Sequence, residues 1–515
     1  MSQSQNNDNA LSEKYQKRTQ TKQTKPLLIA LAAIATLTLI LVAAFALNSD
    51  RAKPQNITVG LVLEPTNLNI RETAGVALDQ ILLDNVYQGL IALKPGTVNE
   101  YVPKLAASLP EVSADGKSYS FKLRSGVKFH DGSEFDSEDV VHSLTRGLNK
   151  EKLKLGGVEV KATGKYAVTV NLNEPNAMLN WLLAGRNGII FSSTENNDLN
   201  NTAIGTGPFT LAQWQQGDRI TLAKNENYWS EAAKLANVTF RFIPDGRAAV
   251  NALKDGTLDV HTALGSNLRD EFANNTEYKL VRASSTDVFT LAYNSNRAPF
   301  NNPDIRRAVS MAIDTDAIIQ SQNGGGLPLG SPITELETGY KDLTAINAYD
   351  PQKAREVLTA NGLSGSAITI TAPNFYDQAP LDIIIEQLRA VGFDAKLELV
   401  EFSTWLKKVY SDKDYDISYV DHAEANDFAN YTNPAYYFGF NSPEVAKLYK
   451  KSLLALDTKT QEKLLTEAAT LVAEQAPAKW LYNYTPTLVI RNGVTGFPTA
   501  NTNSRLNMED VTAKK

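Results

Sequence analysis

Short apolar runs and runs with alternating apolar residues predict strands along most of the chain. The first is ITVGLVL at 57–63, which ends where Glu64-Pro65 disfavours further regular structure. Tyr119, Phe121 and Leu123 alternate with polar residues after a turn signal, the pattern of a half-buried strand. Further strands are expected at 166–172, 209–214, 219–224 and 238–243.

Longer segments with apolar residues three and four positions apart predict helices. Their end signals are clear in places: Asp136 or Ser137 caps one helix, Asp350-Pro351 opens another and Gly362 closes it. The expected helices are 77–93, 136–148, 303–320, 351–361, 381–391, 444–456 and 458–474.

Two stretches far apart in the sequence each predict a β-α-β unit. The first has strands at 238–243 and 258–264 around a helix at 247–254, and the second has strands at 394–400 and 415–420 around a helix at 403–410. Such units make parallel strands with a right-handed crossover. Ligands of open α/β sheets lie outside the carboxyl ends of the strands, so two such lobes predict a binding cleft between them.

The N-terminus carries a different pattern. Residues 1–25 are polar and carry more basic than acidic side chains, most of the basic ones being lysine. Residues 26–47 form an uncharged apolar run, and the polar stretch 48–55 is predicted to be a linker. A helix of about 20 apolar residues spans a bilayer, and the flanking positive charge predicts a cytoplasmic N-terminus with the bulk of the chain outside. The alternative is a cleaved signal peptide, with a cleavage site near Ala46. The length of the run favours the retained transmembrane anchor.

The composition excludes several kinds of chemical site and of partner. The chain has 515 residues, no cysteine and a formal net charge of −6. Absence of cysteine excludes disulfides, thiolate metal sites and cysteine nucleophiles. The acidic balance argues against a nucleic-acid partner, because binding a polyanion needs a basic surface.

Motifs for catalysis or metal binding are missing from the sequence. The four histidines show no HExxH spacing, and His130-Asp131-Gly132 is typical of a tight turn. The glycine run 324–326 lacks the following Lys and Ser/Thr of a phosphate-binding loop, and no G-x-S-x-G occurs. We expect no enzyme activity, metal or cofactor.

The segment 415–440 is the strongest candidate for ligand contact. It leaves a strand of the second β-α-β unit at its carboxyl end and carries carboxylates among aromatic residues. Carboxylates in a partly desolvated cleft hold an ammonium group strongly, and aromatic faces cover side chains or cations. An ordinary polar loop whose aromatic residues pack into the core is the alternative. The candidate residues are Asp421, His422, Glu424, Asp427 and Tyr431.

Several stretches together resemble the family 5 (cluster C) solute-binding proteins of ABC importers, which include dipeptide-, oligopeptide- and nickel-binding members. The most specific is YVPKLAASLPEVSADGKSYSFKLRSGVKFHDGSEFDSEDVVHSL at 101–144. The others are 205–229, 291–319 and, more weakly, 349–363 with 383–401.

The resemblance implies an α/β, type II periplasmic-binding-protein-like fold, with two α/β lobes and an extra inserted domain behind one N-terminal transmembrane helix. Domain I would comprise 56–66, 204–287 and 484–510, domain II would be 67–203, and domain III would be 288–483. The protein would be a non-enzymatic receptor that closes over a small solute, with a peptide favoured, and delivers it to an ABC permease and its ATPase. A membrane-tethered hydrolase and a binding-only sensor or chaperone with the same fold are the alternatives.

Peptide-binding members of the family place an amine-anchoring aspartate in a W-x-G-D-x-x-D-P-like pattern after a corresponding strand. Here the Trp and the Gly-Asp pair are missing, and Asp421 and Asp427 are approximate counterparts. A cationic metabolite or another small solute therefore stays open beside the peptide. Position in the fold adds five further candidate ligand contacts, for each of which a role in core packing or in a turn is the alternative: Glu64, Thr66, Tyr293, Asn294 and Trp405.

Overall fold

The computed structural model describes residues 55–73, 75–149, 153, 155–194, 198–500 and 504–514. The predicted anchor at 26–47, the polar segment before it and the linker up to residue 54 lie outside the described residues. Within the described ranges, no helix is both long and apolar enough to cross a bilayer.

A seven-stranded sheet draws its strands from three separate stretches of chain. Its order is β12-β19-β11-β1-β10-β9-β8, and β1 pairs in parallel with both β10 and β11. The strands are β1 (Asn56–Leu61), β8 (Phe209–Gln215), β9 (Arg219–Lys224), β10 (Asn237–Phe242), β11 (Val260–His261), β12 (Tyr278–Arg282) and β19 (Thr487–Arg491).

Apolar side chains cover both faces of this sheet. Helix α2 (Ala77–Leu82) and the ribbon of β20 (Val494–Thr495) and β21 (Thr512–Ala513) pack on one face. On the other face lie α5 (Gly246–Lys254) and the 3₁₀ segment η3 (Ser266–Phe272). The first predicted β-α-β unit is confirmed as β10-α5-β11, with β1 between its two parallel strands.

A six-stranded sheet of order β14-β18-β13-β17-β15-β16 forms a second body. Strands β16 and β17 both run parallel to β15, which confirms the second predicted β-α-β unit. The strands are β13 (Val288–Tyr293), β14 (Gly326–Pro328), β15 (Ala367–Pro373), β16 (Asp394–Val400), β17 (Ile417–His422) and β18 (Ala478–Tyr484).

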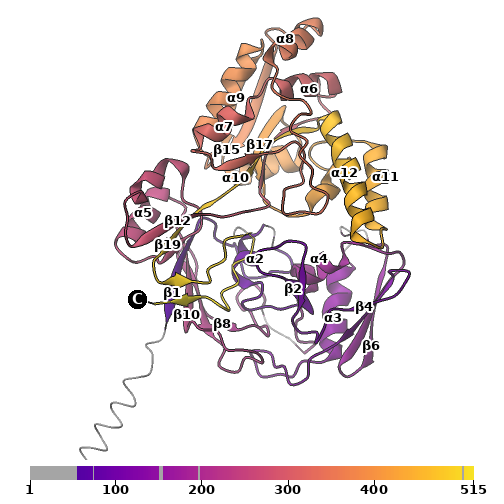
Figure 1. The fold of residues 1–515 in the computed structure, drawn as a ribbon, viewed down its shortest axis with the longest axis vertical. Coiled ribbons are helices and arrows are strands. Elements are labelled where there is room, and N and C mark those ends of the chain that lie inside the picture. The colour runs from indigo at the N-terminus through magenta and orange to yellow at the C-terminus, as the bar shows by residue number, and fades with distance from the viewer. Residues whose placement is uncertain are drawn as a thin grey trace, which may run out of the picture. The chain divides into compact units, whose positions relative to one another are not determined.

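Helices cover both faces of the six-stranded sheet and give three layers, which can be followed in Figure 1. One face carries α6 (Pro303–Met311), α7 (Thr315–Ser321), α8 (Pro351–Ala360) and α9 (Gln378–Ala390). The other carries α10 (Phe402–Trp405) with its π-helical continuation η4 (Leu406–Ser411), the 3₁₀ segment η5 (Asp427–Thr432), α11 (Pro443–Leu453) and α12 (Thr458–Gln475).

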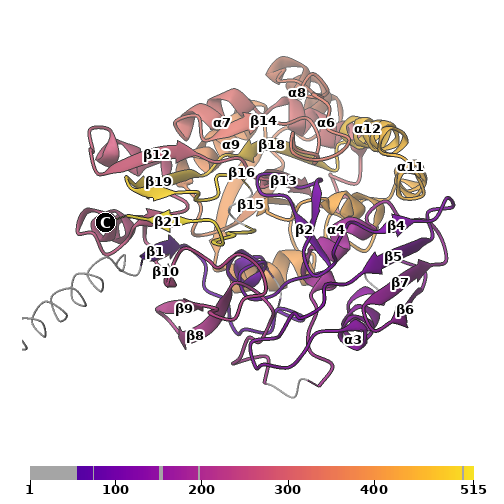
Figure 2. The same cartoon turned by 60° about the horizontal axis from the view of Figure 1, so that its bottom comes forward.

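The third body is a four-stranded antiparallel sheet, β4-β5-β7-β6, with α3 beside it (Figure 2). The Asp136 side chain accepts from the Glu138 N–H and caps α3, as predicted. The elements are β2 (Ile91–Leu93), β3 (Tyr101–Pro103), β4 (Glu111–Val112), β5 (Ser118–Lys122), α3 (Ser137–Leu148), β6 (Val158–Gly164), β7 (Ala167–Leu172), α4 (Leu179–Ala184) and the 3₁₀ turn η2 (Arg186–Gly188).

Two of the expected helices are wrong in extent. The helix expected at 77–93 ends at Leu82, because the Asn85 side chain donates to the Ile81 carbonyl and to the Leu506 carbonyl of the C-terminal segment. The helix expected at 303–320 is two helices, since Asp314 caps α7 by accepting from the Ala317 N–H. The three bodies take their strands from the stretches assigned to the three expected domains, while the domain boundaries stay a prediction.

Candidate functional site

A chamber of about 950 Å³ lies between the six-stranded-sheet body and a wall that combines helix α2, which packs on the seven-stranded sheet, with residues of the four-stranded-sheet body. One wall comes from the stretches around 71–83 and 174–187, and the other from Tyr410, the loop 424–433 and helix α11. Arg505 of the C-terminal segment completes the lining. A volume of this size is at the upper end of the range for small-molecule sites in proteins.

Arg186 holds the first wall of the chamber in place. Its Nε lies 3.1 Å from both carboxylate oxygens of Asp79, and its Nη atoms donate to the carbonyls of Thr73 and Gly75. Burial raises the pKa of the Asp79 carboxyl although the Arg186 charge lowers it. The loss of hydration therefore outweighs the ion pair, and the carboxylate depends on Arg186 to stay ionised.

The other arginines of the chamber are also engaged in contacts. Arg505 forms an ion pair of 2.6 Å with Asp84 and donates to the Ala184 carbonyl. The Arg71 guanidinium lies 3.5 Å from the centre of the Phe191 ring. These guanidinium groups support the wall of the chamber.

Two carboxylates, those of Asp427 and Glu337, hold the loop of the second wall through hydrogen bonds. Asp427 Oδ2 lies 3.2 Å from His422 Nδ1, and His422 Nε2 lies 2.9 Å from the Tyr437 hydroxyl. Glu337 accepts from the Asn426 N–H and the Thr334 N–H, and burial raises its pKa to about 7. These hydrogen bonds fix the conformation of the loop.

Two acidic residues remain available to a solute in the chamber. Glu72 and Glu424 line it, are exposed and form no ion pair within the described part of the chain. Glu424 is close enough to Asp79 across the chamber for its charge to raise the pKa of that carboxyl. The negative charge at this point favours a cationic group of a solute.

Two contacts join the walls of the chamber directly. The Ala177 N–H donates to the Leu453 carbonyl at 2.8 Å, and Lys450 forms an ion pair with Glu174. Both partners of the ion pair are more than half exposed, so it adds little to stability. These contacts tie α11 to the loop between β7 and α4.

An exposed aromatic surface continues from the chamber along α10 and η4. We call it the aromatic ledge: the exposed Phe375, Phe402, Leu406 and Tyr410 together with the half-buried Tyr436. Phe375 is 54% exposed and Tyr410 is 45% exposed, and Tyr410 and Tyr436 also line the chamber. Apolar side chains gathered on a protein surface are typical of a site that a ligand or partner covers.

Comparison with known proteins decides the class of this molecule. Residues 100–444, about two thirds of the chain, match the middle region of family 5 of the bacterial extracellular solute-binding proteins. The chain belongs to this family.

Relatives and solved structures of this kind match most of the chain, and the solved structures share its fold. The chain is 25% identical over 480 residues to a heme-binding protein A of Haemophilus influenzae, covering 82% of this chain and 84% of that protein. It is 25% identical over 486 residues to the oligopeptide-binding protein AppA of Bacillus subtilis, covering 84% and 88%. The structure of an ABC transporter-associated periplasmic binding protein DppA from Helicobacter pylori, in complex with the peptide STSA, superposes with a TM-score of 0.78 at 23% identity, covering 90% of this chain and 99% of that one.

Membership of family 5 confirms that the protein is an extracellular or periplasmic solute-binding protein of the kind that serves ABC importers, and that its class is non-enzymatic. The α/β periplasmic-binding-protein fold is confirmed as well. Ligands differ among the named relatives, so the family alone does not give the solute.

The structure brings some of the candidate residues to the chamber of this family-5 protein. Glu424 and Asp427 line it, and His422 holds Asp427 from behind. Glu64 and Thr66 follow β1 and are exposed, and Glu64 accepts from the Gly217 N–H at 2.7 Å. Neither of these two residues lines the chamber.

Four other candidates lie in the core. Tyr293 is fully buried and its hydroxyl lies 2.9 Å from Ser310 Oγ, and Asn294 donates to two carbonyls. Trp405 Nε1 donates to Ser418 Oγ, and the Tyr431 hydroxyl accepts from Trp480 Nε1. Their polar atoms form hydrogen bonds within the protein. The N–H of Asp421, the remaining candidate, likewise donates to the Tyr376 hydroxyl at 2.9 Å. A direct contact of these residues with the solute therefore remains only a prediction.

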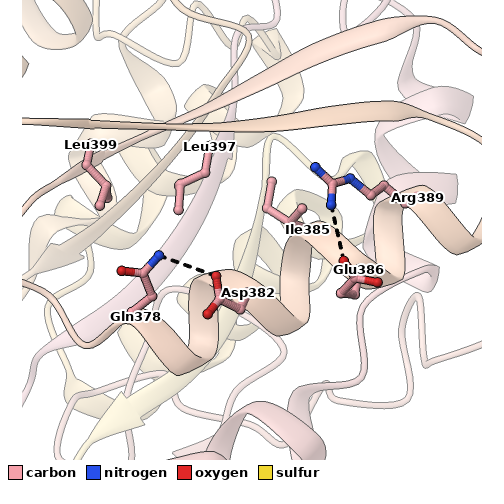
Figure 3. Close-up of a pocket in the computed structure, with 7 residues that line it drawn as sticks. All are labelled: Gln378, Asp382, Ile385, Glu386, Arg389, Leu397 and Leu399. Carbon is pink, nitrogen blue, oxygen red and sulfur yellow. Dashed lines mark hydrogen bonds and ion pairs between the residues drawn. The ribbon is translucent and has the colours of Figure 1, made fainter.

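A second hollow, of about 480 Å³, lies on the outer side of the six-stranded sheet (Figure 3). Leu397 and Leu399 of the edge strand β16 point towards α9, whose Asp382 accepts from Gln378 and whose Glu386 accepts from Arg389. Its polar groups already bond to one another within α9. None of the candidate ligand residues lines it.

Proposed function

We propose that this protein captures a short peptide in the chamber and delivers it to the permease and ATPase of an ABC importer. The observation that carries the proposal is the chamber itself, because different bodies of the fold supply its opposite walls. A solute that touches both walls stabilises the closed arrangement over an open one, and the permease senses that difference.

The chemistry of the lining supports a peptide. Glu424 offers a carboxylate to the terminal ammonium group, and the aromatic ledge beside it covers apolar side chains. We further propose that residues 26–47 form a retained helix that holds the receptor at the outer face of the cell membrane, as their length and the flanking charge predict.

Replacing Glu424 with glutamine should weaken the binding of tripeptides with a free amino terminus by about tenfold or more, because a hydrogen bond to a charged group contributes about 1.5–3 kcal/mol. Isothermal titration calorimetry with a tripeptide panel measures the change. Glu277→Gln removes an exposed carboxylate remote from the chamber lining and serves as the matched control. Failure of every tripeptide to bind the unaltered protein would contradict the peptide proposal, and equal affinities in the Glu424 variant would remove this residue from the site.

A further inference from the structure

Strand β16 forms a long and regular edge of the six-stranded sheet. Three edge strands of the described sheets are seven residues long: β6, β8 and β16. The register of β6 and of β8 shifts against the neighbouring strand, and such bulges protect an edge from further pairing. By contrast, β16 pairs with β15 in an unbroken register from Asp394 to Val400. A long edge strand of this kind presents backbone groups to which another strand binds.

Every second residue of β16 turns its backbone N–H and C=O groups away from β15. The Asp394 N–H donates to the Ser366 carbonyl, and the Val400 carbonyl accepts from the Asn374 N–H. The even-numbered residues of β16 therefore face β15, because the direction of the backbone groups alternates along a strand. The odd-numbered residues direct these groups to the free edge, and they are Ala395, Leu397 and Leu399.

The charged side chains of β16 fit a second copy of the same strand in one antiparallel register. With Leu397 opposite its own counterpart on a two-fold axis, Lys396 of each copy lies opposite Glu398 of the other. A shift by two residues puts either the two Lys396 side chains or the two Glu398 side chains opposite each other. A shift by one residue turns the backbone groups of one strand away from the other. Since opposite charges across a strand pair stabilise it and like charges destabilise it, this register is favoured over its neighbours.

On the other face of β16, the same register brings apolar side chains together. Leu397 and Leu399 point towards α9 beside the hollow of about 480 Å³, and Leu399 is 41% exposed (Figure 3). In this register Leu399 lies opposite Ala395 of the second copy, and the Leu397 side chains of the two copies lie side by side. Arg389 Nε donates to the Ala395 carbonyl at 3.1 Å, and the second lone pair of that oxygen remains for the Leu399 N–H of the second copy. The pairing therefore removes exposed apolar surface from water.

We propose that two copies of this protein associate through antiparallel pairing of their β16 strands, which joins the two six-stranded sheets into one. The interface is the same patch on both copies, so the assembly closes at two copies, the commonest arrangement of identical chains. Among the described residues, none from β16 or α9 lines the chamber. Self-association therefore uses a surface different from the one proposed to capture the solute.

The charged groups at this interface are compatible with their contacts inside one copy. Glu398 forms an ion pair with Lys408, and a carboxylate has about four lone-pair sites, so it also accepts from Lys396 of the second copy. Lys396 lies 3.4 Å from Asp394, but both side chains are more than half exposed and this pair contributes little. The lysine therefore exchanges an exposed partner for one across the interface.

Association should be weak and reversible, because a strand pair of seven residues is a small interface. The full-length protein is studied in a mild detergent because of the proposed membrane anchor. We expect sedimentation velocity to show a monomer–dimer equilibrium between about 10 and about 300 μM. A protein that stays monomeric throughout this range would overturn the proposal.

Exchanging charges tests whether β16 carries the association. Lys396→Glu and Glu398→Lys each place like charges opposite one another in both pairs of the register, so each variant alone should dimerise at least about tenfold more weakly. A mixture of the two variants restores opposite charges in both pairs and should associate about as tightly as the unaltered protein. Lys161→Glu changes an exposed lysine on the edge strand β6 and is the control. Undiminished dimerisation of both variants, or a mixture that associates no better than either variant alone, would contradict pairing through this edge.

Single cysteines report the register itself, since the unaltered chain has no cysteine. Residues 396 and 398 of opposite copies would have Cα atoms about 4.5 Å apart, so a mixture of Lys396→Cys and Glu398→Cys should form a disulfide on mild oxidation. Lys396→Cys alone should form much less, because its two copies would lie diagonally across the strands, about 7–8 Å apart. Equal cross-linking in the two samples, or none in either, would overturn the pairing of β16 with itself.

Discussion

Arg186→Met should lower the free energy of unfolding by about 1–3 kcal/mol, since it removes the hydrogen-bond partner of a largely buried carboxylate and of two carbonyls. Asp79 would lose its guanidinium contacts, and the carbonyls of Thr73 and Gly75 would lose their donors. These residues form part of the chamber wall, so peptide affinity should fall together with stability. Chemical denaturation and calorimetry on the same samples measure both effects.

Two controls make the Arg186 result specific. The double variant Arg186→Met/Asp79→Asn removes the stranded carboxylate and should recover part of the lost stability. Arg297→Met breaks ion pairs with Asp414 and Asp416, but the arginine side chain is 47% exposed, so the expected loss is below about 1 kcal/mol. A loss for Arg186→Met no larger than that of Arg297→Met would contradict the role given to the buried pair.

Between pH 6.5 and pH 4, the unaltered protein should lose about 3 kcal/mol more of its free energy of unfolding than the variant His261→Leu. His261 lies in β11, and burial lowers its pKa to about 4. In that window the unfolded chain takes up a proton at this residue and the folded chain does not, so folding is progressively disfavoured as pH falls. Leucine does not titrate, so the difference in stability between the two proteins should become independent of pH above pH 7.

The packing around His261 explains why its imidazole stays neutral. Its Nδ1 accepts from the Ala263 N–H at 3.3 Å, and its Nε2 is buried without a partner among the described residues. Neighbouring Gly60 brings the strand backbone close to the ring, with no room for a hydration shell. Urea unfolding at several pH values measures the effect, and His142→Leu on the exposed side of α3 is the control. Parallel pH profiles for the unaltered protein and His261→Leu would refute the explanation.

The sequence predicted most of the elements because their signals are local. Asp136 and Asp350 cap their helices through hydrogen bonds to residues two or three positions away. The helix expected at 77–93 fails because Asn85 bonds with Leu506 and Met508, more than 400 positions along the chain. No local pattern in the sequence predicts a contact between residues so far apart.

The residues of the site also divide into those with a local signal in the sequence and those without one. Glu424 and Asp427 were predicted because they follow the carboxyl end of a parallel strand. The Asp79–Arg186 pair was missed, since its partners are 107 positions apart and neither belongs to a motif. The residues of the ledge at positions 402, 406 and 410 have the spacing of a helix face, which sequence alone does not assign to core or surface.

Native mass spectrometry of the purified full-length protein tests solute capture most directly. After addition of a tripeptide mixture, we expect a one-to-one complex whose extra mass equals that of an intact tripeptide, with Glu424→Gln showing less of it at the same concentration. Absence of any complex, or the appearance of cleaved peptides in the mixture, would contradict a receptor that binds its solute between two walls and releases it unchanged.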